Sequence, residues 1–211
     1  KDDFLHKKYA EKKLWDFGEE IIKAFGYDFN RGRQDKAAHP FETTFSVNDV
    51  RITTRFEAGN PLAMIFSTMH EAGHGMYEQG VNPAFERTAL ESGASLAVHE
   101  SQSRMWENLV GRSLPLWEHF FPKLKKTFPA QLDGVGLRAF YKGVNKVEPS
   151  LIRVNADEAT YNLHIMLRLD LEIAMVENKV ELKHLPEIWN TKMREYLGVT
   201  PPNDAQGVLQ D

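Results

Sequence analysis

Hydrophobic residues recur at helical spacing along most of the chain. Between residues 4 and 25 they fall three or four positions apart, and Gly26 offers a stop, so this stretch predicts one long amphipathic helix. Asn60 as a cap and Pro61 as a first residue predict a second helix that runs to Gly80. By the same reasoning, further helices are expected over 89–110, 115–127, 134–146, 157–176 and 186–198, before an irregular tail.

One stretch follows a different period. Within residues 43–56, apolar Val50 and Ile52 alternate with Arg51 and Thr53, which is the two-residue repeat of a strand. The Asn48-Asp49 dipeptide makes an antiparallel hairpin plausible. The polar residues that precede residue 43 are interpreted as a loop. The chain is therefore expected to be mainly α, with one small antiparallel β-hairpin just before the helix that begins at Pro61.

Composition narrows the function classes. The 211 residues are 42% hydrophobic and 27% charged, which suits one folded domain over 1–211. A net charge of -4 leaves no excess of cations, so nucleic acid and anionic membranes are not expected as partners. No apolar stretch approaches the roughly 20 residues of a membrane span, and the N-terminus lacks a secretory signal, which favours the cytoplasm. Cysteine is absent, so metal ligands must come from His, Asp and Glu.

His70, Glu71 and His74 form an H-E-x-x-H motif within the predicted helix 61–80. On a helix the two histidines lie about 40° apart around the axis and about 6 Å along it, so both imidazoles can reach one ion. Glu71 projects beside them and is the candidate general base, because zinc acidifies a coordinated water whose proton a nearby carboxylate can take. The alternative is a buried, hydrogen-bonded histidine pair. The fold class expected for the chain is a mainly α, helical zincin (gluzincin-like) domain, with the hairpin next to the metal-binding helix.

A catalytic zinc site needs a third protein ligand. Position 80 is Gly, which excludes the metzincin extension, so a glutamate of the next helix is expected. Glu100 stands in a polar island, His99–Ser103, that suits ligation, although by spacing alone a solvated role is equally good. The glutamates considered as the third ligand are Glu86, Glu91, Glu100 and Glu107. Of these, Glu107 and Glu91 are expected to lie in solvent at the helix surface.

Five motifs in order resemble those of the M32 metallocarboxypeptidases. They are His39-Pro40-Phe41, Asp49–Arg55, His70–His74, His99–Ser103 and Ile152–Glu158. The resemblance implies a largely helical fold with a deep cleft, metal ligands His70, His74 and Glu100, and a zinc ion, with cobalt as an alternative. It further implies a broad-specificity carboxypeptidase acting on peptides, and a homodimer. Members of this family are more than twice as long, so the chain is expected to be a fragment that lacks the N-terminal helices and the extreme C-terminus.

The substrate-side residues are less sharply indicated. Arg153, in an apolar setting, is the candidate for binding the terminal carboxylate of a peptide, and an internal salt bridge is the alternative. Tyr161, on a polar stripe with His164, is the candidate oxyanion donor, against a plain buried hydroxyl. His39, Arg55 and His164 are further substrate-binding candidates, while His6, His119 and His184 are expected at the surface.

Two further ideas follow from the same residues. The strand at 50–56 is a candidate edge that could pair with an extended substrate backbone, or a simple solvent-facing hairpin. Rival functions are a metallo-oligopeptidase or aminopeptidase with the same metal site, and a noncatalytic peptide-binding module whose zinc is structural and has a fourth protein ligand.

Overall fold

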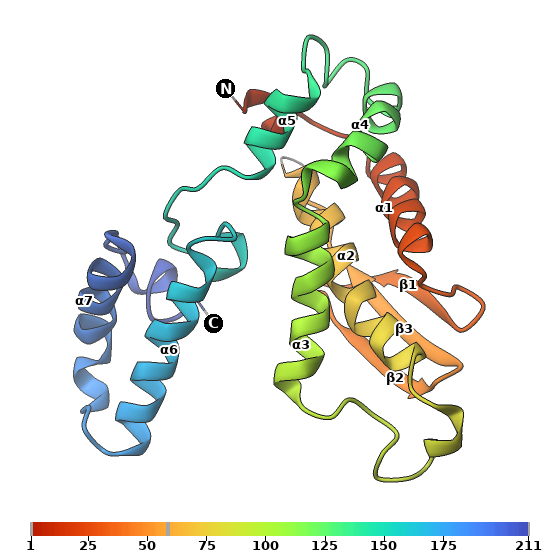
Figure 1. The fold of residues 1–211 in the computed structure, drawn as a ribbon. Coiled ribbons are helices and arrows are strands. Elements are labelled where there is room, and N and C mark those ends of the chain that lie inside the picture. The colour runs from red at the N-terminus through yellow and green to blue at the C-terminus, as the bar shows by residue number, and fades with distance from the viewer. Residues whose placement is uncertain (1, 58–59, 211) are drawn as a thin grey trace. The chain divides into compact units, whose positions relative to one another are not determined.

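The computed structural model describes residues 2–57 and 60–210, and it divides into two compact units, Lys1–Val144 and Asn145–Asp211 (Figure 1). Asp211 lies outside the described residues. The single domain predicted over 1–211 stays a prediction. No helix in the described ranges is long and apolar enough to cross a bilayer.

Unit 1 combines helices with a three-stranded sheet. Its helices are α1 (Glu11–Phe25), α2 (Pro61–Gln79), α3 (Leu96–Arg104), the π-helix η3 (Met105–Val110), α4 (Leu114–Thr127) and α5 (Leu137–Val144). Its strands are β1 (Gly32–Lys36), β2 (Glu42–Ser46) and β3 (Asp49–Thr54). The mainly α class predicted from the sequence is confirmed.

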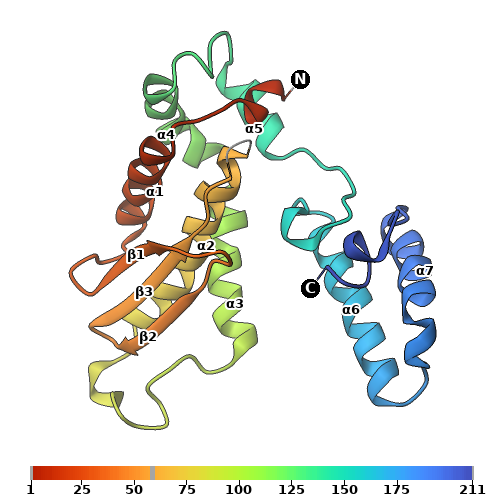
Figure 2. The same ribbon diagram turned by 180° about the vertical axis from the view of Figure 1, so that it is seen from behind.

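The sheet has the order β1-β3-β2, as Figure 2 shows from behind. The predicted antiparallel hairpin is β2 and β3, but β1 pairs in parallel with β3 in a segment expected to be a loop. Gly32 permits this pairing, because a Cβ there would lie 2.0 Å from the carbonyl oxygen of Val50. The idea that β3 is an edge strand is wrong, since both of its edges are paired.

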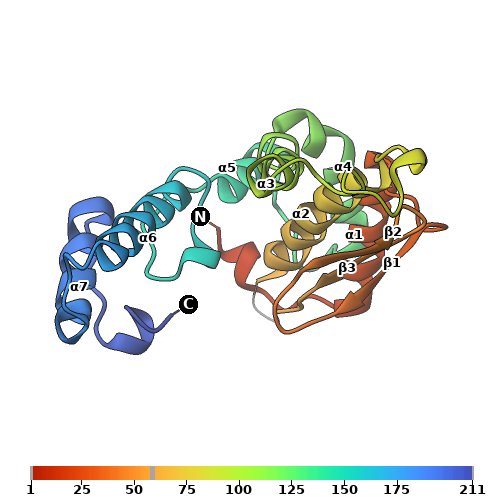
Figure 3. The ribbon, with the colours of Figure 1, turned by 90° about the horizontal axis from the view of Figure 1, so that it is seen from below.

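Helix α2 begins where the sequence predicts. The Asn60 side chain accepts a hydrogen bond from the backbone N–H of Ala63 at 3.2 Å, and Pro61 is the first helical residue. One face of α2 packs on the sheet, where Ala72 joins a small core with Ile22, Tyr27 and Ile52. Another face packs on α3, so α2 lies between the sheet and α3 (Figure 3).

Two predicted helices of unit 1 start seven residues later than their hydrophobic pattern indicated. The helix expected over 4–25 is instead a 3₁₀ turn, Asp3–His6, followed by α1 from Glu11. In the segment that joins these two elements, the hydroxyl of buried Tyr9 donates to the carbonyl of Phe4 at 2.9 Å. The helix expected over 89–110 begins only at Leu96, because Ser95 caps it through the N–H of Val98.

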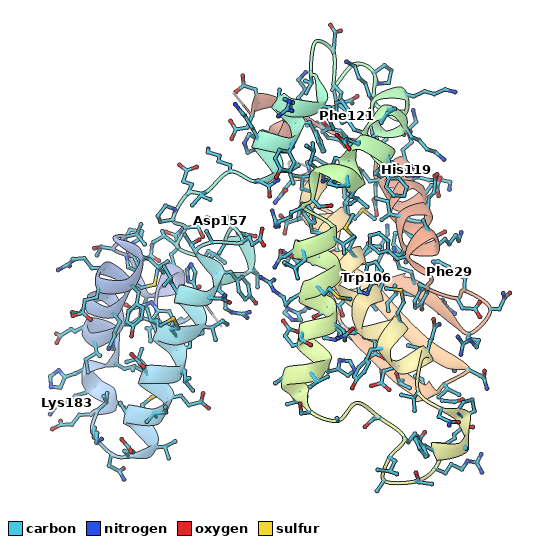
Figure 4. All side chains as sticks on the ribbon, viewed as in Figure 1. Phe29, Trp106, His119, Phe121, Asp157 and Lys183 are labelled. Atoms are coloured by element: carbon cyan, nitrogen blue, oxygen red, sulfur yellow. The ribbon has the colours of Figure 1, made fainter. Side chains whose placement is uncertain are left out.

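Unit 2 is a helical hairpin, α6 (Tyr161–Val176) and α7 (Leu185–Leu197) (Figure 1). Leu167, Leu171, Trp189 and Met193 form its core. The helix expected from residue 157 begins at Tyr161, with Thr160 as its N-cap. Asp157 lies in the turn before α6, where Figure 4 labels it, and its carboxylate accepts from the backbone N–H groups of 159 and 160. The predicted surface positions of His6, His119 and His184 are confirmed, and Figure 4 labels His119 on α4.

Candidate metal centre

Helix α2 presents His70 and His74 one turn apart. Their ring centroids lie 4.9 Å apart, and their side chains are 20% and 14% exposed. Glu71, beside them on the same helix, is buried. The helix spacing of the motif therefore produces the expected pair of neighbouring imidazoles.

Gly73, between the two histidines, allows α3 to approach α2 closely. A Cβ at this position would lie 2.6 Å from the Cα of Ser103, a distance that would force backbone to move. The close approach brings the Oε2 atom of Glu100 to 3.2 Å from His74 Nε2 and 3.6 Å from His70 Nε2. The hydroxyl of Ser103 donates to the same Oε2 at 3.1 Å.

These three side chains fit a zinc ion. Their candidate ligand atoms all lie within 4.8 Å of one another. Ligand atoms of a tetrahedral zinc with bonds of about 2.0–2.2 Å stand roughly 3.3 Å apart, close to the Nε2–Oε2 separations here. Within residues 2–57 and 60–210 the cluster has three members, which is the number of protein ligands found at catalytic zinc sites.

The two carboxyl groups of the site differ in acidity. Burial raises the pKa of Glu71 to about 7, and a carboxyl of that pKa can both accept and donate a proton near neutrality. Burial also acts to raise the pKa of Glu100, but the hydrogen bond with His74 and the charge of His70 outweigh it and lower the pKa to about 2. Glu100 is therefore a carboxylate ready to bind a cation.

The structure corrects the expectation that Glu107 is solvated. Its Oε2 lies 2.8 Å from His70 Nδ1 and accepts a hydrogen bond from Arg104 Nη1 at 2.8 Å, and its side chain is only 14% exposed. The solvated position expected for Glu107 is wrong because the helix turns its polar face towards α2. Its apolar residues face outward instead, and Leu96 and Leu109 are 91% and 71% exposed.

A spacing signal could have identified Glu107. It follows Glu100 by seven residues, which is two helical turns and places both carboxylates on one face. It also lies in the π-helix η3, a distortion found at many functional sites. Neither of the other glutamates considered as ligands joins the cluster. Glu91 instead accepts from the backbone N–H of Arg87 at 2.5 Å, and Glu86 ends the 3₁₀ turn Pro83–Phe85.

The ring of His74 lies within hydrogen-bonding distance of a second imidazole, that of His99. Its Nδ1 lies 2.5 Å from Nδ1 of His99, and Nε2 of His99 lies 2.7 Å from Oε1 of Glu78. The sequence marked His99 only as part of the polar island and did not single out Glu78. The four-residue spacing from His74 to Glu78 on α2 was the available signal.

The substrate-side candidates of unit 1 lie by the sheet. His39 is exposed in the segment between β1 and β2. Arg55 pairs with Glu57, and its Nη1 donates to the carbonyl of Ala38 at 3.4 Å, next to His39. Their predicted part in substrate binding stays a prediction.

Unit 2 gathers the other substrate-side candidates. The Nη1 of Arg153 donates to the hydroxyl of Tyr161 at 2.8 Å, and the Oε1 of Gln210 accepts from the Arg153 backbone N–H at 3.2 Å. The guanidinium of Arg168 donates to the same Oε1 at 3.0 Å and to the carbonyl of fully buried His164 at 3.1 Å. We call these five residues the arginine cluster; their roles stay predictions.

Comparison with known proteins shows which family the chain resembles. The family model described as carboxypeptidase Taq (M32) metallopeptidase matches residues 1–211. Thermostable carboxypeptidase 1 of Thermus thermophilus is 50% identical over 207 residues, which cover 98% of this chain and 40% of that protein. Carboxypeptidase 1 of Bacillus subtilis is 42% identical over 208 residues, 99% of this chain and 42% of that protein.

A solved structure agrees with these matches. The crystal structure of an M32 carboxypeptidase from Deinococcus radiodurans aligns with a TM-score of 0.97 at 49% identity, covering 99% of this chain and 42% of that one. The chain thus spans about two fifths of the length of these relatives. The family model covers all of its residues, and the chain belongs to the carboxypeptidase Taq (M32) metallopeptidases.

Proposed function

We propose that the protein is a zinc-dependent carboxypeptidase that releases amino acids from the C-termini of peptides, with the ion held by His70, His74 and Glu100. The observation that carries the proposal is the convergence of two imidazole Nε2 atoms and one carboxylate oxygen beside buried Glu71. The relatives that the chain matches are named as carboxypeptidases, which supports the reaction class. Cobalt is the alternative ion for the same donor set.

Each residue has a distinct role in this proposal. When bound, zinc would polarise the scissile carbonyl and acidify water at its open position. Glu71 removes the proton from the attacking water and delivers it to the leaving amine, as a general base and then a general acid. Tyr161 donates a hydrogen bond to the developing oxyanion.

The terminal carboxylate of the peptide is assigned to Arg153, whose planar guanidinium can bind it at two points. His39 and Arg55 are proposed as further substrate contacts, whereas His164 is fully buried in unit 2 and is not proposed as one. The homodimer implied by the family resemblance and the cytoplasmic location stay predictions.

The mechanism is tested by separating metal binding from hydrolysis in the full-length protein. Glu71→Gln is expected to keep stoichiometric zinc and to lower kcat by about 10²- to 10⁴-fold, the usual contribution of general acid–base catalysis. Glu100→Ala is expected to lose zinc affinity. Glu86→Gln, which changes a glutamate outside the cluster, is the control and is expected to keep both zinc and activity.

Metal content per protein and the rate of amino-acid release are the measurements. Full activity in Glu71→Gln would contradict the assigned base. Unchanged zinc affinity in Glu100→Ala would contradict the assigned third ligand.

A further inference from the structure

The two histidines of the metal centre are supported in different ways. His70 Nδ1 meets a carboxylate directly, since Glu107 lies 2.8 Å away. His74 Nδ1 meets a second imidazole, His99, which in turn meets the carboxylate of Glu78. The second arrangement needs one more residue and a defined set of proton positions.

Those proton positions follow from the chemistry of imidazole. An imidazole that binds a metal through Nε2 carries its proton on Nδ1. Nδ1 of His74 therefore donates, and Nδ1 of His99, at 2.5 Å, must accept. A neutral His99 then carries its proton on Nε2, which donates to Oε1 of Glu78 at 2.7 Å. One tautomer of each ring satisfies both hydrogen bonds.

We propose that His99 and Glu78 are positioning residues that hold His74 in the tautomer and orientation needed to bind the metal. The proposal rests on the proposed role of His74 as a metal ligand. His99 and Glu78 act through His74 and do not contact the ion. Glu78 fixes the tautomer of His99, and His99 fixes the tautomer of His74.

The surroundings of this chain of side chains favour a built arrangement. The Glu78 side chain is only 4% exposed, and a carboxylate buried so deeply needs hydrogen-bond donors. Its Oε1 has two, because the backbone N–H of Gly93 also donates to that oxygen, at 3.2 Å. Oε2 is buried without a hydrogen-bond partner among the described residues. Glu78 thus accepts one hydrogen bond from the loop before α3 and one from α3 itself.

Packing fixes the His99 ring from both sides. It stacks on the His74 ring with centroids 4.6 Å apart and meets the Tyr77 ring edge-on at 5.3 Å. Gly93 is required beside it, since a Cβ there would lie 2.9 Å from Cδ2 of His99 and 2.6 Å from the Tyr77 ring. The ring has little freedom to rotate away from His74.

The test measures metal binding in the full-length protein, by zinc competition with a chelator and by the absorption spectrum of the cobalt-substituted form. His99→Leu removes the acceptor and is expected to weaken zinc binding by about 10- to 100-fold and to change the cobalt spectrum. His99→Asn places an amide oxygen near the position of Nδ1 and is expected to recover part of the affinity.

Variants of Glu78 complete the series. Glu78→Gln keeps an acceptor for His99 and is expected to lose less affinity than Glu78→Leu. The double variant of His99→Leu and Glu78→Leu is expected to bind zinc no more weakly than His99→Leu alone, because the first change already breaks the chain.

Gln79→Leu is the matched control. Gln79 neighbours Glu78 on α2 and is equally buried, but it holds the backbone of Asp28. Its variant is expected to melt at a lower temperature with an unchanged zinc affinity and cobalt spectrum.

The outcomes separate this inference from the proposed function. A wild-type protein that fails to bind zinc stoichiometrically would overturn the metal site itself. Tight zinc binding that is the same in His99→Leu, with the same cobalt spectrum, would overturn only the positioning role. A loss in His99→Leu that His99→Asn does not reduce would show that His99 fills space, and would overturn the role of its hydrogen bond.

Discussion

The metal centre of unit 1 and the arginine cluster of unit 2 are assembled from opposite kinds of groups. The metal centre combines imidazoles and carboxylates, a donor set for a cation. The arginine cluster contains two guanidinium groups, donors that suit an anion, together with a hydroxyl and an amide whose oxygens accept hydrogen bonds from them. The two regions therefore suit ligands of opposite charge, each within its own unit.

The two regions also differ in how far apart their residues lie in the sequence. His70 and His74 are one helical turn apart, and the third member of the cluster follows on the next helix, α3. In the arginine cluster, Gln210 joins the backbone of Arg153 from 57 positions away. The metal centre therefore depends on how closely two helices pack, whereas the arginine cluster depends on the fold of the chain's last described residues.

The largest expected effect is a loss of zinc affinity when the packing of α2 on α3 is disturbed. Gly73→Ala places a methyl group against the backbone of Ser103, so α3 must move and carry Glu100 away from the histidines. We expect zinc affinity to fall by more than about 100-fold, beyond the loss typical of residues that only support a ligand. Chelator competition measures it.

Gly18→Ala is the matched control for that variant. It also adds a methyl group to a buried helical glycine, but its nearest neighbour would be a Thr68 side-chain carbon at an ordinary 3.4 Å. Zinc affinity should be unchanged. An equal loss in both variants would mean that the close approach of the two helices does not determine the site.

The next largest effect is expected in the arginine cluster. Arg153→Ala removes the guanidinium assigned to the peptide carboxylate, and a hydrogen bond to a charged group contributes about 1.5–3 kcal/mol. In the full-length protein, kcat/KM for peptides with a free C-terminus should fall about 10- to 100-fold, with zinc content unchanged.

Blocked peptides sharpen this prediction. The wild-type protein should cleave N-acetylated peptides and largely spare C-amidated ones, whereas an aminopeptidase would do the reverse. Arg194→Ala, at an exposed position on α7, is the control and should leave the preference intact. An equal loss in Arg153→Ala on free and amidated peptides would make Arg153 a structural residue.

The smallest effect concerns the turn before α6. Burial acts to raise the pKa of Asp157, but hydrogen bonds from the backbone of Glu148 and Thr160 outweigh it, so the folded pKa lies below the ordinary value. A lowered folded pKa means that the carboxylate stabilises the folded state above the unfolded pKa, and that this contribution is lost as the pH falls through the folded pKa.

Asp157→Ala should therefore lower the free energy of unfolding by about 1 kcal/mol at pH 7, the usual net contribution of a hydrogen bond, because Glu148 and Thr160 lose the acceptor that joins them. The difference from the wild type should shrink as the pH falls below about 3.9. Denaturant unfolding at pH 7 and pH 3 measures it, with exposed Glu158→Ala as the control. A difference that does not depend on pH would mean that the charge of Asp157 contributes nothing.

Local signals in the sequence were enough for the helix that carries the metal ligands. Asn60 and Pro61 define where α2 begins, and the four-residue spacing places His70 and His74 on one face. The alternation of 50–53 likewise predicted the hairpin. Each of these signals depends on residues close in sequence within one element, which is why it could be interpreted without the fold.

The tertiary structure decided which faces meet. Strand β1 is polar, and its pairing depends on a partner strand and on the absence of a side chain at Gly32. The helix of Glu100 and Glu107 turns its polar face inward, because that face meets the histidines of α2 and the carboxylates are satisfied there. Hydrophobic spacing along one helix cannot reveal this orientation, since it depends on what the neighbouring helix presents. The same reason hid Glu78 and His99, whose partnership exists only where α2 and α3 pack together.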